Sequence, residues 1–249
     1  MGTLALSELG GASDGPTLLV GPSLGTDVRR LWSPVVPLLD GRWRVLGWDL
    51  PGHGDSPTAT GFTLADLAGE LLDLLPGRFA YAGVSVGGAV GLELALAAPD
   101  RVRAAALVCT GALIGTPEAW HERADLVERE GTGAVAAGSA ARWFAPGFAD
   151  GTALLEALLT VDPVGYAAVC RALAGYDVRN RLAEVVVPLL AVAGAEDLAT
   201  PVPTLREVAD GVPGTELVVV DGVAHLPSVE APARVAELLT GFLADLLPG

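Results

Sequence analysis

Three residues of this 249-residue chain have the order and the surroundings that nucleophilic catalysis needs. Ser85 lies in the pentapeptide Gly83-Val84-Ser85-Val86-Gly87, Asp197 follows an apolar run, and His225 follows the next apolar run. A serine attacks a carbonyl carbon only when a base removes its proton, and a histidine base needs a carboxylate to fix its tautomer. The three side chains therefore indicate acyl transfer from an ester, a lactone or an amide.

The pentapeptide around Ser85 has the context of a sharp turn between a strand and a helix. The apolar run Phe79-Ala80-Tyr81-Ala82 precedes it, and a helix-forming run with many small residues, 86–97, follows it. The flanking glycines are needed because a Cβ at either place would strike the neighbouring strand or helix. With 32 glycines in the chain the pentapeptide alone is a weak signal. Its context predicts a nucleophile elbow with Ser85 as the nucleophile.

The acid and the base are expected at the same edge of a sheet as the nucleophile. Residues 188–193 and 217–220 predict buried strands, and Asp197 and His225 follow them on loops. Ligands of open α/β sheets gather at the carboxyl ends of parallel strands. Two alternatives stay open: Asp197 also fits a helix N-cap before Pro201, and His225 also fits an ordinary surface histidine.

Two loops are predicted to supply the backbone N–H groups of an oxyanion hole. Residues 17–20 predict a short central strand, and the loop 21–26 follows it where hydrolases present an N–H to a developing oxyanion. The second donor comes from the residue after the nucleophile. The predicted pair is therefore Leu24 and Val86.

The distribution of apolar runs predicts an α/β fold in three parts. Residues 1–113 and 179–249 form a core with a mainly parallel sheet flanked by helices, and 114–178 form a helical cap inserted before the last strands. The predicted strands are 4–9, 17–20, 45–48, 79–83, 102–109, 188–193 and 215–220. The predicted helices are 32–39, 64–75, 86–97, 118–130, 153–160, 163–174 and 232–246.

The cap is expected to determine which substrate is cleaved. Trp120 and Arg123 lie three residues apart on one helix face, and Trp143 begins the next cap segment. The arginine would bind a carboxylate through two parallel N–H···O bonds, and the tryptophan rings would form apolar walls. In the alternative interpretation, Arg123 pairs with nearby glutamates in solvent and the tryptophans only pack the cap onto the core.

Composition and charge exclude several classes of function. Fifteen basic residues against thirty acidic ones give a net charge of −15, and nucleic-acid binding needs a basic face. No run of 18 apolar residues lacks a polar interruption, and the amino terminus has no signal-peptide pattern, so we expect no membrane association and a cytoplasmic location. Cys109 and Cys170 are expected to be reduced, buried thiols.

The three histidines do not form a metal-binding motif. His53, His121 and His225 are far apart, and the chain has no His-Glu-x-x-His or paired Cys-x-x-Cys sequence. We therefore expect neither a metal nor a cofactor. His53 is predicted to be structural, because it lies in a turn-forming Gly/Pro segment and the base position is already filled.

Four segments spread over the chain resemble the 3-oxoadipate enol-lactonases of the α/β-hydrolase superfamily. They are Ser23-Leu24-Gly25-Thr26-Asp27, Thr116 to Arg123, Arg142-Trp143-Phe144 and His225 to Glu230. The first two are much more specific than Gly-x-Ser-x-Gly. The chain departs from the family pattern at Pro22, where a polar residue is usual, at Val86, where Met is common, and in an amino terminus shorter by about one edge strand. None of these departures removes a catalytic group.

The resemblance implies a cofactor-free carboxylic ester hydrolase that opens the enol-lactone of the β-ketoadipate pathway of aromatic catabolism through an acyl-enzyme on Ser85. Its partner is a small anionic lactone, which an acidic protein repels unless a local cation compensates. We expect a monomer or a small homo-oligomer. The alternatives are another serine hydrolase of this fold (a carboxylesterase, a perhydrolase or a carbon–carbon hydrolase) and a non-catalytic small-molecule-binding member. Haloalkane dehalogenases and epoxide hydrolases are disfavoured, because their nucleophile is Asp.

Overall fold

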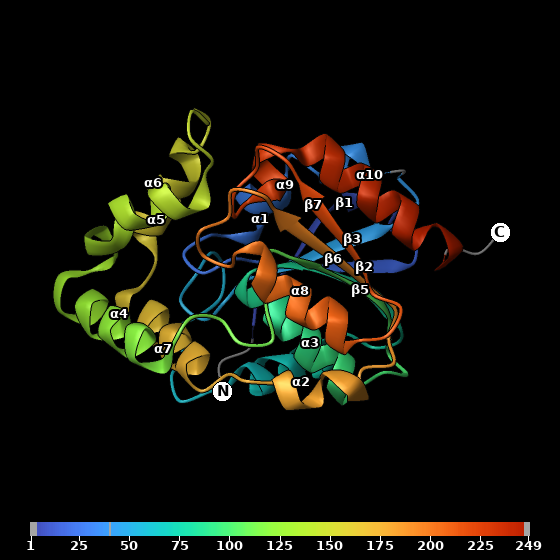
Figure 1. The fold of residues 1–249 in the computed structure, drawn as a ribbon, viewed down its shortest axis with the longest axis horizontal. Coiled ribbons are helices and arrows are strands. Elements are labelled where there is room, and N and C mark those ends of the chain that lie inside the picture. Colours follow the sequence, from blue (N-terminus) through green and yellow to red (C-terminus); the bar gives the residue numbers. More distant parts are fainter. Residues whose placement is uncertain (1–3, 40, 247–249) are drawn as a thin grey trace.

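The computed structural model describes residues 4–39 and 41–246 and has a seven-stranded sheet at its centre (Figure 1). The strands are β1 (Leu6–Gly11), β2 (Thr17–Gly21), β3 (Arg44–Trp48), β4 (Phe79–Val84), β5 (Val102–Val108), β6 (Leu189–Gly194) and β7 (Glu216–Val220). They follow the order β1-β3-β2-β4-β5-β6-β7, in which β1 is antiparallel to β3 and all other neighbours are parallel. The carboxyl ends of the six parallel strands therefore meet at one edge, as predicted.

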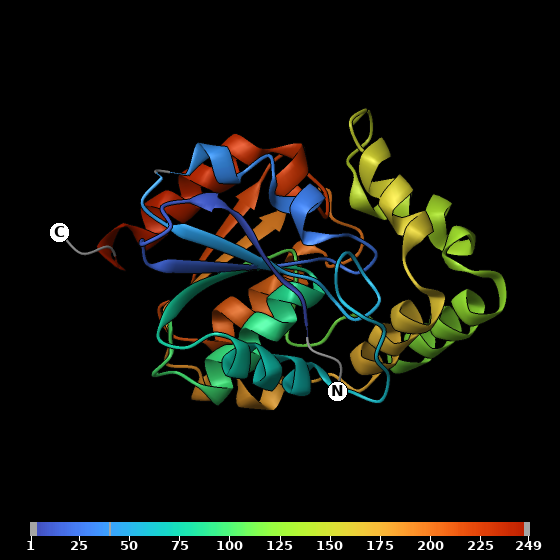
Figure 2. The ribbon, with the colours of Figure 1, turned by 180° about the vertical axis from the view of Figure 1, so that it is seen from behind.

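Helices cover both faces of the sheet, which explains why its central strands are continuous apolar runs. One face carries α2 (Leu64–Leu74), α3 (Val86–Ala97) and α8 (Val202–Gly211), and the other carries α1 (Val28–Trp32), α9 (Pro227–Glu230) and α10 (Pro232–Leu243) (Figures 1 and 2). Every residue of β4 and β6 is buried. The first ten residues of α3 are buried too, and all of them except Glu93 are apolar or glycine, so this helix packs on every side and its first turn lies at the sheet edge.

Four helices between β5 and β6 form a layer beside the sheet, and we call them the cap helices (Figure 1). They are α4 (Pro117–Glu130), α5 (Ala136–Trp143), α6 (Thr152–Thr160) and α7 (Pro163–Ala174). Arg171 of α7 binds Asp125 and Glu128 of α4, which fastens these two helices to each other. No strand occurs among residues 114–178, all of which are described. The proposed limits of the cap as a separate unit stay a prediction.

One predicted helix is wrong, and three helices of the structure had no prediction. A helix over 32–39 is wrong: α1 ends at Trp32, and only the 3₁₀ turn η1 (Val36–Leu38) follows. The Asp27 side chain accepts the N–H of Arg30 at 2.9 Å and starts the helix early, and Pro34 and Pro37 then lack the N–H that a longer helix would need. Helices α5, α8 and α9 were not predicted from the sequence. The remaining 3₁₀ turns are η2 (Thr132–Val135), η3 (Arg179–Glu184) and η4 (Ala244–Leu246).

The helices and the two cysteines bear on the expectations about membranes and disulfides. No single helix within 4–39 and 41–246 is both long and apolar enough to cross a membrane, and α6 and α7 pass that test only together, across a bend of 100°. Cys109 and Cys170 are both buried and free of a disulfide, as predicted. Cys109 directly follows β5, has a positive φ of 46° and lies close to Asp197 and His225.

Candidate active site

The turn between β4 and α3 holds Ser85 in the strained conformation expected of a nucleophile elbow. Its φ of 56° and ψ of −118° lie outside the regions that L residues usually adopt. A Cβ on Gly83 would lie 2.4 Å from the carbonyl oxygen of Gly87, and a Cβ on Gly87 would lie 2.5 Å from that of Pro22. Both glycines are therefore required by close backbone approach, as predicted from the sequence.

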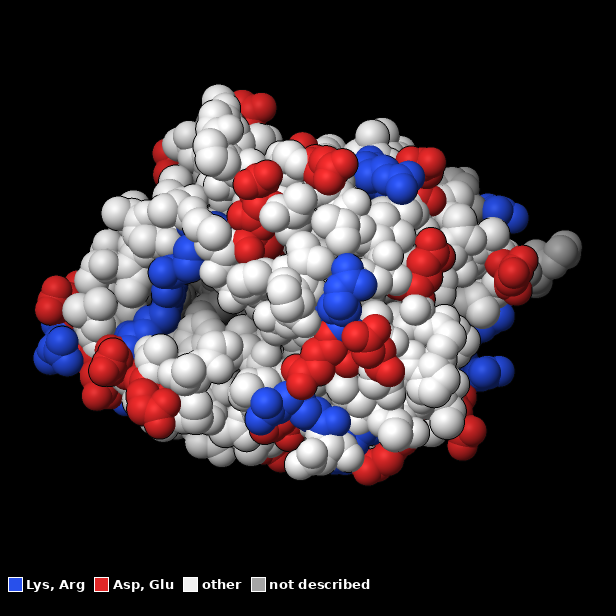
Figure 3. Space-filling model, in the orientation of Figure 1, with Lys and Arg blue, Asp and Glu red and all other residues white. Residues whose placement is uncertain are grey.

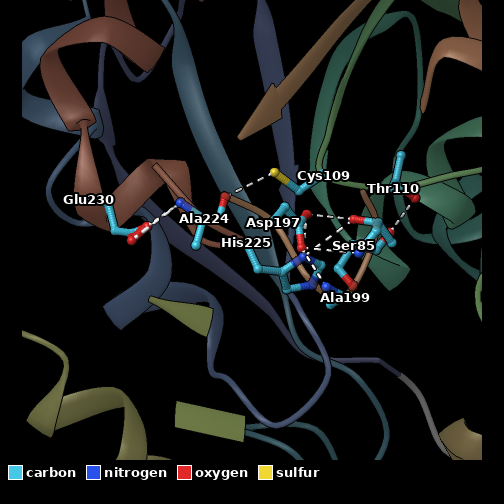
Figure 4. Close-up of polar contacts among 9 residues, drawn as sticks. Ser85, Cys109, Thr110, Asp197, Ala199, Ala224, His225 and Glu230 are labelled. Carbon is cyan, nitrogen blue, oxygen red and sulfur yellow. Dashed lines mark hydrogen bonds and ion pairs between the residues drawn. The ribbon is translucent and has the colours of Figure 1, made fainter. Parts of the chain in front are cut away.

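Asp197 and His225 form a buried hydrogen-bonded pair (Figure 4). The Nδ1 of His225 lies 2.9 Å from Oδ2 of Asp197. That oxygen also accepts the Thr200 hydroxyl at 2.7 Å, and Oδ1 accepts the N–H groups of Ala199 and Thr200 at 2.7 and 3.0 Å. Burial acts to raise the pKa of Asp197, but the His225 charge and the hydrogen bonds from His225 and Thr200 outweigh it and lower the pKa to about 2. An ionised carboxylate only accepts, so Nδ1 carries the proton and Nε2 is left to act as a base.

The structure excludes the two alternatives for the acid and the base. Helix α8 begins at Val202 with Pro201 as its N-cap, so Asp197 does not cap it. His225 is 3% exposed and lines the same cavity as Ser85, so it is not a surface histidine. Among the described residues no hydrogen bond joins the Ser85 hydroxyl to His225. In apo structures such bonds are often long and tighten only when substrate binds.

The two predicted oxyanion donors, Leu24 on the loop after β2 and Val86 at the start of α3, lie on segments that touch each other. The N–H of Gly87, in the first turn of α3, donates to the carbonyl of Pro22 at 2.9 Å and ties the elbow to the loop after β2. Neither Leu24 nor Val86 has an acceptor for its N–H among the residues that the structure describes. Val86 is the first residue of α3, where the helix dipole favours negative charge. The arrangement can stabilise an oxyanion, and the role of both amides stays a prediction.

A cavity of about 510 Å³ lies between the cap helices and this edge of the sheet. Ser85 and His225 line it from the core side, and all three cap residues named from the sequence line it from the other. Figure 3 shows basic side chains gathered along the hollow between cap and core, whereas acidic and basic patches alternate over the remaining face. Arg123 and Arg142 line the cavity together with Glu122, so its Arg and Glu side chains leave one net positive charge in an acidic protein. Its lining also includes Leu24, Trp120 and Trp143.

Arg123 is held in place by other cap residues. Its Nε donates to the hydroxyl of Tyr166 at 2.8 Å, its Nη2 donates to Ser139 at 2.9 Å, and its guanidinium lies 5.6 Å from the Tyr166 ring centre. The alternative that Arg123 pairs with nearby glutamates is therefore wrong. Burial raises the pKa of Tyr166 to about 12, although the charge of Arg123 opposes this, so the phenol is a neutral partner at pH 7.

Arg142 is the cation of the cavity that has no acceptor within the described part of the chain. It lies near the end of α5, is about half buried, and has a pKa lowered first by burial and then by the charge of Arg123. A guanidinium that is partly desolvated beside a second guanidinium is electrostatically unfavourable until an anion joins it. This pair of arginines is the strongest sign of a ligand with a negative charge.

The two tryptophans of the cap both line the cavity but make different hydrogen bonds. Trp120 lies in the wall of the cavity, and its Nε1–H donates to the carbonyl of Ile114. Trp143 was expected to begin a cap segment, but it is the last residue of α5. It is buried, lines the cavity, and its carbonyl accepts the N–H groups of His225 and Leu226, each at 3.2 Å. Both tryptophans therefore form wall and also contribute to packing.

Sequence reasoning missed several residues that support the site. Asp197 accepts the N–H of Ala199 two residues on, as in an Asx turn, and Thr200 follows directly, so this contact had a usable local signal. Thr110 binds the carbonyl of Ser85 at 2.7 Å, and the Tyr166 hydroxyl accepts from Arg123 across 43 residues. Glu230 lies in the segment His225 to Glu230 that carries part of the resemblance, but its bond to Ala145 depends on packing between elements, as do the contacts of Thr110 and Tyr166.

The remaining candidate ligands do not form a separate site. His53 does not line the cavity; its Nδ1 lies 3.0 Å from the Pro51 carbonyl, and burial lowers its pKa to about 4, which fits the predicted structural role. One group of three close metal-ligand types occurs within the described ranges, namely Cys109, Asp197 and His225. A metal ion there would have to displace the Asp197–His225 hydrogen bond, so that group does not fit a resident metal.

Comparisons with known proteins agree with this geometry. A model of the alpha/beta hydrolase family matches residues 18–238. The chain is 30% identical to a 3-oxoadipate enol-lactonase of Acinetobacter baylyi, over 96% of this chain and 92% of that protein. The crystal structure of the enol-lactonase from Burkholderia xenovorans superposes with a TM-score of 0.92 at 31% identity and covers 97% of this chain and 96% of that one. A putative carbamate hydrolase of Yersinia enterocolitica is 29% identical over 86% of this chain and 82% of its own length.

Proposed function

Because the chain belongs to the alpha/beta hydrolase family, we propose that it is a serine hydrolase that opens 3-oxoadipate enol-lactone to 3-oxoadipate. The reaction belongs to the β-ketoadipate pathway of aromatic catabolism. The elbow at Ser85 and the buried pair of Asp197 and His225 support the class of reaction. The likeness to enol-lactonases at 30 and 31% identity supports the choice of a lactone.

The unpaired Arg142 is the observation that carries the choice of an anionic substrate. It lines the same cavity as Ser85 and His225, and Arg123 adds a second positive charge beside it. A carboxylate binds a guanidinium through charge-assisted hydrogen bonds, which are about twice as strong as neutral ones. The carboxylated arm of the lactone would therefore point to the cap, which leaves its carbonyl carbon for the nucleophile.

The first half of the reaction forms an acyl-enzyme. His225 Nε2 takes the proton of Ser85, and the serine oxygen attacks the lactone carbonyl. The N–H groups of Leu24 and Val86 stabilise the tetrahedral oxyanion, and one such donor is worth about 2.7–4 kcal/mol in measured cases. The carbon–oxygen bond of the ring then breaks, the proton held by His225 passes to the departing enol oxygen, and the acyl group stays on Ser85.

The second half releases the product and restores the enzyme. The enol of the acyl chain tautomerises to a ketone, which makes ring opening effectively irreversible. His225 removes a proton from water, the resulting hydroxide attacks the acyl ester, and the proton returns to Ser85 as the ester bond breaks. No redox step and no cofactor enters this sequence.

A carboxylesterase for a larger anionic ester is the second candidate. The cavity volume of about 510 Å³ supports it, since sites of about 300–1,000 Å³ bind ligands of drug size. The similarity to a putative carbamate hydrolase also supports a broader class of acyl-transfer enzymes. Both candidates use the same catalytic residues and differ only in the substrate that the cap admits.

We expect the purified protein to open the enol-lactone with kcat/KM of at least about 10⁴ M⁻¹ s⁻¹, and to hydrolyse neutral p-nitrophenyl acetate at least about tenfold less efficiently. Spectrophotometry of both substrates under identical conditions measures the two values. Hydrolysis of esters without lactone opening would favour the carboxylesterase. No turnover of either substrate by a folded protein that still binds adipate would favour a non-catalytic ligand-binding role.

Arg142→Ala is expected to lower kcat/KM for the carboxylated lactone about 30- to 160-fold, equivalent to about 2–3 kcal/mol of transition-state free energy. The reason is that it removes a charge-assisted hydrogen bond to a partly desolvated carboxylate. The neutral ester should hardly be affected. Arg123→Ala is expected to act in the same direction on the lactone, because it removes the second charge and frees Tyr166 and Ser139.

The matched control is Arg129→Ala on the same helix as Arg123, since Arg129 is exposed and, among the described residues, pairs only with Glu130. It should leave both substrates unaffected. Equal losses on lactone and ester in either cavity variant would mean that this arginine only holds the cap together. A full effect in Arg123→Ala with none in Arg142→Ala would assign the carboxylate to Arg123.

A further inference from the structure

Glu230 connects the cap to the backbone on either side of the catalytic histidine. It ends the short helix α9, and its Oε1 accepts the N–H of Ala145, which follows α5 in the cap. Its Oε2 accepts the N–H of Ala224, the residue before His225. Both distances are 2.7 Å, which is typical of charge-assisted hydrogen bonds. Figure 4 shows the bond to Ala224 and the short path from there to the Asp197–His225 pair.

A second set of bonds joins the same two segments. The N–H groups of His225 and Leu226 both donate to the carbonyl of Trp143 at 3.2 Å. The loop 224–226 thus donates directly to the cap at Trp143, and Glu230 accepts N–H groups from both segments. The residue before Trp143 is Arg142, and both line the cavity. A shift of this part of the cavity wall would therefore move the backbone of the catalytic histidine, because the Trp143 carbonyl is hydrogen-bonded to that backbone directly.

The Glu230 carboxylate lies in partly buried surroundings, close to a second carboxylate. It is only partly exposed, and burial raises its pKa, although the N–H groups of Ala145 and Ala224 oppose that rise. The charge of Asp197 acts on it in the same direction as burial. If the cap segment moved away, the carboxylate would keep one partner, and the N–H groups of His225 and Leu226 would lose theirs. Unpaired backbone groups in a buried loop favour rearrangement of that loop.

We propose that Glu230 is a positioning residue that couples the docking of the cap to the alignment of His225, so that the triad is complete only when segment 143–145 is seated. Glu230 acts through the Ala224 backbone and touches no substrate. Since a carboxylate on Arg142 would hold α5 in its docked position, an anionic substrate would itself complete the catalytic site. That last step rests on the proposed function, whereas the coupling applies to any ester that Ser85 cleaves.

Glu230→Gln tests the coupling with little change in shape. Glutamine keeps one acceptor oxygen but places an NH₂ group opposite the second N–H, so one of the two bonds becomes a repulsive contact. With neutral p-nitrophenyl acetate, which needs the triad and not Arg142, we expect kcat to fall about tenfold or more, equivalent to about 1.4 kcal/mol, and KM to stay within about twofold. Glu230→Ala should lower kcat at least as much.

Asp162→Asn is the matched control, because Asp162 also ties cap to core but far from the histidine loop. Its Oδ2 accepts the hydroxyl of Thr58 at 2.9 Å, and its Oδ1 caps α7. This variant removes the carboxylate charge from a contact between cap and core without touching 224–226, so its kcat on the small ester should equal that of the wild type. Equal losses in Glu230→Gln and Asp162→Asn would overturn the proposal, since both would then reflect general loosening of the cap.

Proton NMR provides a readout that does not depend on turnover. The Nδ1–H of His225, bonded to Asp197, should give a far-downfield resonance in the wild type and in Asp162→Asn, and this resonance should broaden or vanish in Glu230→Gln. An unchanged resonance and an unchanged kcat in folded Glu230→Gln would overturn the coupling and leave the proposed function standing.

If both Glu230 variants fail to fold, amide hydrogen exchange of the wild type decides. Slow exchange of the N–H groups of Ala145, Ala224 and His225 as one cooperative unit supports the coupling, and independent exchange of these groups overturns it.

Discussion

Replacing Ser85 with alanine is expected to lower kcat by about 10⁴-fold or more on both the lactone and a neutral ester, because the members of a triad act as a unit. The fold should remain intact. Alanine has the same Cβ in the strained elbow, so it adds no clash, and the lost hydroxyl makes no hydrogen bond within the described residues. Steady-state kinetics measures the loss, and circular dichroism with thermal unfolding measures the fold.

Labelling with a fluorophosphonate probe sharpens this test. The wild type should gain one adduct on Ser85, and Ser85→Ala should gain none. The matched control is Ser33→Ala, which changes an exposed serine at the end of α1 and should label and turn over normally. Activity of folded Ser85→Ala within tenfold of the wild type would show that another group carries the nucleophilic step.

Asp197→Asn is expected to fold and to lose about 10⁴-fold in kcat, the size seen when a triad histidine adopts the wrong tautomer. The local geometry explains why. The N–H groups of Ala199 and Thr200 require an oxygen at the Oδ1 position, so the new NH₂ group falls at Oδ2 and faces Nδ1 of His225. The ring must then accept at Nδ1 and carry its proton on Nε2, where it no longer accepts the proton of Ser85.

The same substitution changes how stability depends on pH. Asp197 has its pKa lowered from 3.8 to about 2, so its stabilising contribution is present above about pH 3.8 and is lost as pH falls toward 2. The asparagine variant lacks this contribution at every pH. The difference in unfolding free energy between wild type and Asp197→Asn should therefore shrink between pH 4 and pH 2 in chemical denaturation experiments.

Asp221→Asn is the control for both measurements, since Asp221 is exposed on the loop after β7 and lies outside the Asp197–His225 pair. It should keep full activity and an unchanged acid dependence. Near-normal turnover by Asp197→Asn would place the acid of the triad elsewhere. Normal turnover with a changed acid dependence would make Asp197 a structural carboxylate only.

The sheet and its catalytic loops could be predicted because buried parallel strands have a strong local signal. The runs 79–83 and 188–193 are apolar at every position, and the structure places β4 and β6 there with all residues buried. Helix α5 was harder to predict from the sequence. Gly138 and Ser139 interrupt its alanines in the middle, and the cap contacts that hold it are absent from any local window of sequence.

By itself, the sequence determined the kinds of catalytic groups, their order along the chain and their place at the carboxyl ends of strands. Those features depend on neighbours within a few residues, as in the glycines around Ser85. Only the tertiary structure decided that Arg123 is bound by Tyr166 while Arg142 has no partner among the described residues, and that Glu230 reaches Ala145 from 85 residues away. These pairings arise when separate elements pack together, so the free energy of each contact depends on distances that no single segment encodes.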